Sequence, residues 1–97
     1  MSVTAYHFWS PTCTPCKVIK PAIEDLKEEF PFVSWVTVNT HEDREGLSRS
    51  LGVQVVPTIV VIARSKEGAT LYTEKHSGTA MVGYYRILRS AMRSVPQ

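Results

Sequence analysis

Cysteine is scarce in this chain, which has only two cysteines among its 97 residues. Two cysteines cannot build the multi-disulfide framework that holds many small secreted domains together. They also supply only half of the four ligands that a structural zinc site needs, and the histidines His7, His41 and His76 are scattered along the sequence. We therefore expect no bound metal and no disulfide scaffold.

Charge of one sign and long apolar runs are also lacking. The formal net charge is +2, which is too small to indicate binding to nucleic acid or to a membrane surface. No apolar run approaches the length that crosses a bilayer, and Met1–Trp9 lacks the basic and apolar regions of a signal peptide. We expect a cytoplasmic monomer that binds neither nucleic acid nor membranes.

The remaining composition is that of an ordinary globular domain, with 43% hydrophobic and 21% charged residues. The sequence contains no internal repeat, low-complexity tract or linker. Its length fits one domain over residues 1–97. Because a chain this short buries only a modest core, we expect a small margin of stability.

The hydrophobic pattern of the first half predicts two strands around a long helix. Val3–Trp9 is short, β-branched and aromatic, which is typical of a strand. Apolar residues recur at helical spacing over Cys13–Phe30. Pro21 should kink this helix and Pro31 should end it, because proline lacks an N–H and restricts the residue before it. Phe32–Asn39 predicts the second strand.

The second half predicts shorter elements. Asp43–Leu51 fits a short helix, and Thr58–Arg64 and Leu71–His76 fit the two strands of a hairpin. Thr79 is a suitable N-cap for a last helix that reaches about Ser94. The order βαβαββα predicts an α/β fold with a central four-stranded mixed sheet flanked by helices on both faces.

The motif that carries chemistry is Cys13-Thr14-Pro15-Cys16, between a predicted strand and a predicted helix. Residues three apart on a helix lie on one side, so the two sulfurs can reach disulfide distance. The first cysteine is placed where unpaired N–H groups and the helix dipole favour an anion, which lowers its thiol pKa. The motif predicts a redox pair in which Cys13 is the exposed attacking thiol and Cys16 the resolving thiol. The alternative is a passive buried pair.

The chain resembles the thioredoxin family. The matching residues are, in order, Phe8-Trp9, Cys13-x-Pro15-Cys16-Lys17, Pro21, Val56-Pro57-Thr58 and Gly78. The resemblance covers roughly residues 3–95 and implies a thioredoxin-like fold without the usual N-terminal strand and helix. It also implies a cis Val56–Pro57 bond beside the cysteines, with the backbone of Val56 pairing with a substrate chain.

The same resemblance implies a protein-disulfide reductase that needs no cofactor. Cys13 would attack a disulfide in a protein substrate, and Cys16 would resolve the mixed disulfide. A thioredoxin reductase or a small thiol would regenerate the dithiol. The substrate-binding residues implied around the cysteines are Thr12, Thr14, Pro15, Val56, Pro57 and Gly78.

The chain departs from the family's pattern next to the cysteines. The usual Trp and Gly of the motif are replaced by Thr12 and Thr14. The buried Asp of the family corresponds to His7, and the Lys near it to Trp35. His7 has two interpretations of equal weight. It is a packed core histidine, or it transfers a proton with Cys16, because an unperturbed histidine titrates near neutral pH.

Two other functions stay open from the sequence. A glutaredoxin-like reductase would use glutathione, although Gly78–Met81 lacks the acidic pair expected to bind the amino group of glutathione. A thioredoxin-fold binding module for a larger enzyme would not need its cysteines. Replacing both cysteines with serine separates these functions, because only the binding module would keep its role.

Overall fold

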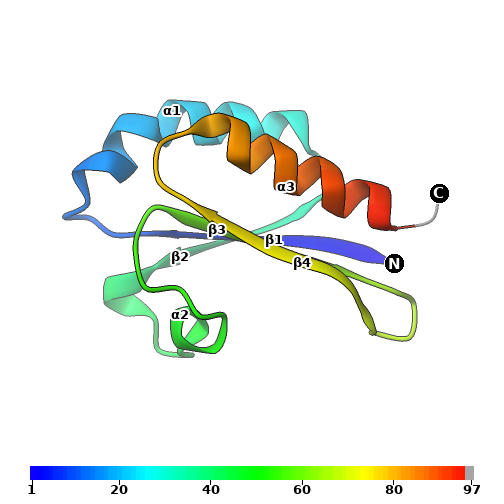
Figure 1. The fold of residues 1–97 in the computed structure, drawn as a ribbon. Helices are drawn as coiled ribbons and strands as arrows, with labels where there is room; N and C mark the ends of the chain where they lie inside the picture. The colour runs from blue at the N-terminus through cyan, green and yellow to red at the C-terminus, as the bar shows by residue number, and fades with distance from the viewer. Residues whose placement is uncertain (96–97) are drawn as a thin grey trace.

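The computed structural model describes residues 1–95 and shows one sheet with helices on both faces (Figure 1). In chain order the elements are β1 (Ser2–Trp9), α1 (Thr14–Glu29), β2 (Ser34–Asn39), the 3₁₀ helix η1 (Thr40–Glu42), α2 (Leu47–Ser50), β3 (Thr58–Arg64), β4 (Thr70–Ser77) and α3 (Met81–Ser94). Apart from the short η1, this is the predicted βαβαββα order. None of the helices within residues 1–95 is long and apolar enough to cross a membrane.

The four strands are arranged in the order β2-β1-β3-β4. β1 pairs in parallel with β2 and antiparallel with β3, while β3 and β4 form an antiparallel hairpin. The predicted mixed sheet is therefore confirmed. β3 is buried over nearly its whole length and is rich in Val and Ile, as expected for a strand covered on both faces. The central position of β1 fixes the point at which the chain leaves the sheet and enters α1.

The core is divided by the sheet. α1 and α3 cover one face and α2 lies on the other (Figure 1). Val3 and Ala5 of β1 pack into the larger cluster, together with side chains of α1 and α3, whereas Phe8 belongs to the smaller cluster on the α2 face. Because alternate residues of a strand point to the same face, His7 lies on the face covered by α1.

Two predicted helix starts are wrong, by four residues for α2 and by one for α3. α2 begins at Leu47 rather than Asp43, because the carboxylate of Asp43 accepts the backbone N–H groups of Leu47 and Ser48, at 2.9 Å each. These side-chain hydrogen bonds hold the residues before Leu47 in a non-helical conformation, so the helix begins later in the sequence. The N-cap of α3 is Ala80 and not Thr79, and it makes no side-chain capping bond.

The first turn of α3 lies very close to β4. The imidazole of His76 on β4 occupies the space into which a Cβ at Gly83 would project. The ring is held by a hydrogen bond of 2.9 Å between its Nε2 and the carbonyl oxygen of Ala80, and by an edge contact with Tyr84. The glycine at position 83 therefore sets how closely α3 approaches the sheet.

Gly83→Ala should lower the free energy of unfolding by about 1–3 kcal/mol, because the new methyl group overpacks against the His76 ring. This loss is expected although alanine favours a helix over glycine by about 1 kcal/mol. Urea unfolding measures it. In a His76→Ala background the clash is gone, so Gly83→Ala should be neutral or stabilising. An equal loss in both backgrounds would show that the ring is not the cause.

Candidate active site

Cys13 and Cys16 form a disulfide at the start of α1, with their Cα atoms 5.2 Å apart. Cys13 is the N-cap residue of the helix, and its Sγ accepts the backbone N–H of Cys16 at 3.1 Å. Pro15 lies in the first helical turn, where its missing N–H costs no hydrogen bond. The free N–H groups and the dipole of α1 therefore favour negative charge on the Cys13 sulfur.

Both cysteines of the disulfide are largely buried. In this disulfide form the exposed fraction is 9% for Cys13 and 8% for Cys16, so the greater exposure of the Cys13 thiol stays a prediction for the reduced protein. The Cys13 sulfur lies 3.6 Å from the carbonyl oxygen of Val56, which belongs to a loop far along the sequence. That loop covers Cys13, and sequence spacing alone did not reveal it.

The loop beside Cys13 has the predicted conformation. The Val56–Pro57 peptide bond is cis, which confirms the expectation from the family resemblance. The backbone N–H of Gly78 donates to the carbonyl oxygen of Pro57 at 3.0 Å. Gly78 has a φ of 98°, a conformation that favours glycine. The structure thus brings Val56, Pro57 and Gly78 together next to Cys13.

The hydroxyl of Tyr84 bonds to the backbone of this cis-proline loop. Its side chain is fully buried, and its hydroxyl donates to the carbonyl oxygen of Gly78 at 2.5 Å and lies 3.3 Å from that of Pro57. Burial raises the pKa of Tyr84 to about 12, so the hydroxyl keeps the proton that it donates. The helical pattern of the sequence indicates only a core position for Tyr84, because periodicity does not show what a hydroxyl bonds to.

Thr58 makes a second set of hydrogen bonds at the cis-proline loop. Its hydroxyl donates to the carbonyl oxygen of Val55 at 2.7 Å and lies 2.6 Å from the hydroxyl of Ser77 on β4. Thr58 is itself buried. The two hydroxyl networks attach the cis-proline loop to β3, β4 and α3.

His7 lies on β1 with an exposed fraction of 8%, and its buried Nδ1 has no hydrogen-bond partner within residues 1–95. Burial lowers the pKa of His7 from 6.5 to about 4. The nearby charge of Lys27 also lowers this pKa, whereas Glu24 acts in the opposite direction. The expectation that His7 titrates near neutral pH is therefore wrong, and its ring is uncharged at pH 7. A neutral imidazole can still accept a proton or a hydrogen bond.

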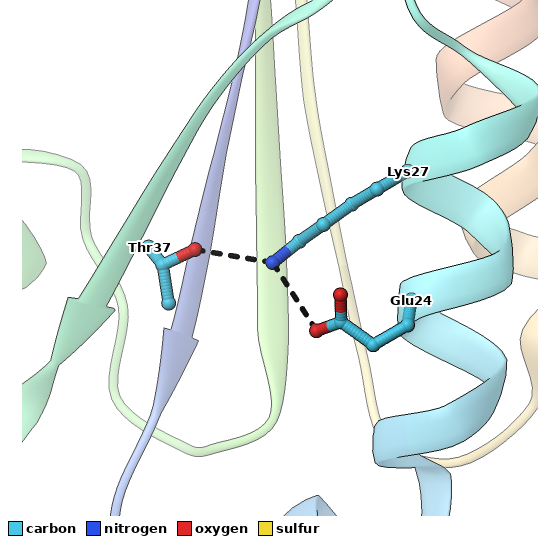
Figure 2. Close-up of polar contacts among 3 residues, drawn as sticks. All are labelled: Glu24, Lys27 and Thr37. Carbon is cyan, nitrogen blue, oxygen red and sulfur yellow. Dashed lines mark hydrogen bonds and ion pairs between the residues drawn. The ribbon is translucent and has the colours of Figure 1, made fainter.

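The strand register gives the neighbour of His7 on β2. His7 pairs with Thr37 of β2, whereas Trp35 pairs with Ala5, two residues earlier. An ammonium group nevertheless reaches this position from α1. Figure 2 shows the side chain of Lys27 extending from the helix to β2, where its Nζ donates to the hydroxyl of Thr37 at 3.2 Å. The same Nζ lies 3.6 Å from the carboxylate of Glu24.

A cavity of about 410 Å³ lies between α1 and the end of β1. Its walls include Cys16, His7, Trp9 and Thr37, but Cys13 is not part of them. The charged residues that line it are Lys17, Lys20, Glu24 and Lys27. We call it the Cys16 cavity. Within residues 1–95, no group of three or more His, Cys, Asp or Glu side chains could hold a metal ion.

Comparisons with known proteins agree with this geometry. The sequence model of the family described as Thioredoxin matches residues 3–84. A thioredoxin of Haemophilus influenzae is 32% identical over 63 residues, which are 65% of this chain and 59% of that protein. The chain spans between 30% and 59% of the length of three curated relatives that it matches.

Solved structures are similar in fold. The X-ray structure of Fasciola hepatica thioredoxin has a TM-score of 0.73 and 24% identity, and the match covers 97% of this chain and 82% of that one. A crystal structure of the complex between ferredoxin:thioredoxin reductase and thioredoxin f2 gives a TM-score of 0.75 at 21% identity, over 94% of this chain and 78% of that one. The predicted fold class is therefore confirmed.

Tyr84→Phe should loosen the cis-proline loop, because the carbonyl group of Gly78 loses the hydroxyl that donates to it. The expected loss in the free energy of unfolding is about 1–2 kcal/mol, and KM for a protein disulfide should rise. Tyr85→Phe is the matched control, since it removes a hydroxyl that bonds to Glu29 at the surface. Identical unfolding curves and KM values for the two variants would contradict the role of Tyr84.

His7 should make the protein less stable in mild acid. The unfolded chain binds a proton at position 7 below pH 6.5, but the folded protein does so only near pH 4. Between these values the unfolded state binds more protons, so the free energy of unfolding falls as the pH drops, by about 3 kcal/mol over the whole window.

Urea unfolding at pH 7 and pH 4.5 tests this dependence. His7→Phe should flatten the acid loss, because it removes the titrating ring. His41→Gln removes an exposed histidine and should keep the slope of the original protein. If His7→Phe lost as much stability in acid as the original protein, burial of the neutral ring would not be the cause.

Proposed function

The chain belongs to the thioredoxin family, and we propose that it is a thiol–disulfide oxidoreductase that reduces protein disulfides. The observation that carries this proposal is the Cys13–Cys16 disulfide at the start of α1, with the Cys16 N–H directed at the Cys13 sulfur. A thiolate is the species that attacks a disulfide, and this position favours one. The family match supports this function over a glutaredoxin-like enzyme or a binding module that does not use its cysteines.

The reaction proceeds in two steps. The Cys13 thiolate attacks a disulfide of the substrate protein, which releases one substrate thiolate and forms a mixed disulfide. Cys16 then attacks the Cys13 sulfur, which releases the second thiolate and restores the internal disulfide. Two electrons have passed to the substrate. A thioredoxin reductase or a small thiol returns them to the protein, and no cofactor is needed.

His7 is proposed to handle the proton of Cys16. Cys16 must lose its proton before it can attack, and both residues line the Cys16 cavity. The Nδ1 of His7 has no hydrogen-bond partner within residues 1–95, and the ring is neutral at pH 7, so His7 can accept a proton. Because the pKa of His7 is about 4, the ring holds this proton only during the attack.

Substrate is proposed to bind around Cys13. Thr12, Thr14 and Pro15 are exposed beside it, and the carbonyl group of Val56 faces its sulfur. An extended substrate segment pairs with the backbone of Val56 as an added strand.

Two further residues shape this surface from within. The ring of Pro57 is buried, so it fixes the course of the Val56 loop instead of contacting the substrate. Gly78 leaves the far side of this surface without a side chain.

The proposed setting is a cytoplasmic, single-domain monomer. Its partners are disulfide-containing proteins and a thioredoxin reductase or small thiol that regenerates the dithiol. The structural neighbour in complex with ferredoxin:thioredoxin reductase supports a reductase as partner. The relatives include chloroplastic and bacterial proteins, so the compartment is part of the proposal.

Cys16→Ser should accumulate mixed disulfides with substrate proteins, because the resolving step is lost while the attack remains. Insulin, a protein with accessible disulfides, serves as substrate, and non-reducing electrophoresis with mass spectrometry detects the adduct. Cys13→Ser is the control and should give no adduct. Normal turnover by Cys16→Ser would contradict the two-step reaction, and adducts on Cys13→Ser would reverse the roles of the cysteines.

A further inference from the structure

The connection between β4 and α3 begins with a histidine that the proposed redox chemistry does not use. His76 is the second-last residue of β4, and its Nε2 lies 2.9 Å from the carbonyl oxygen of Ala80. A carbonyl oxygen only accepts hydrogen bonds, so this nitrogen has the hydrogen and donates it. The bond encloses Gly78, which borders the substrate surface in the proposed function. Figure 1 shows the connection at the end of the sheet where α1 begins.

The start of α3 depends on this bond because the helix has no side-chain cap. Its N-cap residue is Ala80, whose methyl group cannot accept an N–H of the first turn. The carbonyl oxygen of Ala80 accepts two donors, the backbone N–H of Gly83 at 3.3 Å and the Nε2–H of His76. Helix ends are the parts of a protein that open most readily. A side chain of β4 therefore fixes a helix turn that would otherwise fray.

Packing holds the imidazole of His76 in the position from which it donates. The ring lies against the backbone of Gly83, in space that a side chain at that position would fill. It also makes an edge contact with the ring of Tyr84, with a centroid distance of 4.6 Å and an interplanar angle of 89°. Edge-to-face contact is a favoured arrangement of aromatic rings. The ring is therefore held on two sides while it bonds to Ala80.

Both backbone groups of Gly78 depend on the same neighbours. Its N–H donates to the carbonyl oxygen of Pro57 at 3.0 Å, and its carbonyl oxygen accepts the hydroxyl of Tyr84 at 2.5 Å. Tyr84 lies in the first turn of α3 and contacts the His76 ring. A shift of His76 would therefore move Tyr84, and Tyr84 would move Gly78 and the cis peptide that follows Val56.

We propose that His76 is a positioning residue for protein substrates: its hydrogen bond to Ala80 holds Gly78 and the cis-proline loop in the arrangement that binds an extended substrate segment. The proposal rests on the proposed function, because it concerns the surface around the same redox pair. The reactivity of Cys13 is set separately, by the Cys16 N–H at the start of α1. His76 therefore acts on substrate binding and not on the attack by the sulfur.

Two variants separate the hydrogen bond of His76 from the packing of its ring. His76→Phe keeps a ring against Gly83 and Tyr84 but has no donor for Ala80. His76→Gln loses the ring but has an amide N–H at about the same distance along the side chain. With insulin as substrate, KM should rise about fivefold in His76→Phe, which corresponds to one net hydrogen bond, while kcat stays about the same. His76→Gln should keep a KM close to that of the original protein.

Urea unfolding of the same variants distinguishes positioning from general stabilisation. His76→Gln leaves space beside Gly83 and loses the contact with Tyr84, so it should unfold at a lower urea concentration than His76→Phe. If His76 only stabilised the fold, the less stable variant would have the higher KM. We expect the reverse order, in which His76→Gln is less stable but binds insulin better. KM values that follow the order of stability, or an unchanged KM in His76→Phe, would overturn the proposal.

Two controls complete the experiment. His41→Gln removes an exposed histidine and should leave KM for insulin unchanged. Hydroxyethyl disulfide, a small neutral disulfide, reports the reactivity of Cys13 without the loop, and the reduced proteins should react with it at equal rates. A fivefold slower reaction of His76→Phe with this reagent would overturn the proposal, because His76 would then act on the sulfur. Failure of the original protein to reduce insulin would instead contradict the proposed function, so the two failures are distinguishable.

Discussion

The hydrogen bond from the Cys16 N–H to the Cys13 sulfur is the interaction on which the site depends. It exists because β1 lies in the middle of the sheet and delivers the chain directly into α1. The apolar face of α1 is buried against the sheet, so the start of the helix cannot move away from the strand end. The packing of the core thereby directs the Cys16 N–H at the Cys13 sulfur and makes the two cysteines chemically unequal.

Features that depend on nearby residues could be predicted from the sequence. The strands and the two long helices follow from local hydrophobic period, and the position of the redox motif follows from the order of strand, motif and helix. The cis bond before Pro57 could be predicted only through the family resemblance, because nothing in the local sequence requires it.

Features that depend on distant contacts could not be predicted. The sequence gives no sign that the Tyr84 hydroxyl reaches Gly78 and Pro57, since these groups meet only after α3 packs on the sheet. The pairing of His7 with Thr37 depends on the register between two strands, which residue spacing does not specify. The acid-shifted pKa of His7 likewise arises from burial beneath α1, a property of the assembled core.

The hydrogen bonds of Tyr84 and Thr58 attach the Val56 loop, and with it the proposed substrate surface, to the packed core of the protein. A recognition loop that is anchored in the core opens only when that core opens, so its conformational entropy is already lost before a substrate arrives. The cost of ordering the loop is met once, during folding, and is not met again in each catalytic cycle. In the proposed function, a protein substrate therefore adapts its own segment to a loop that is already ordered.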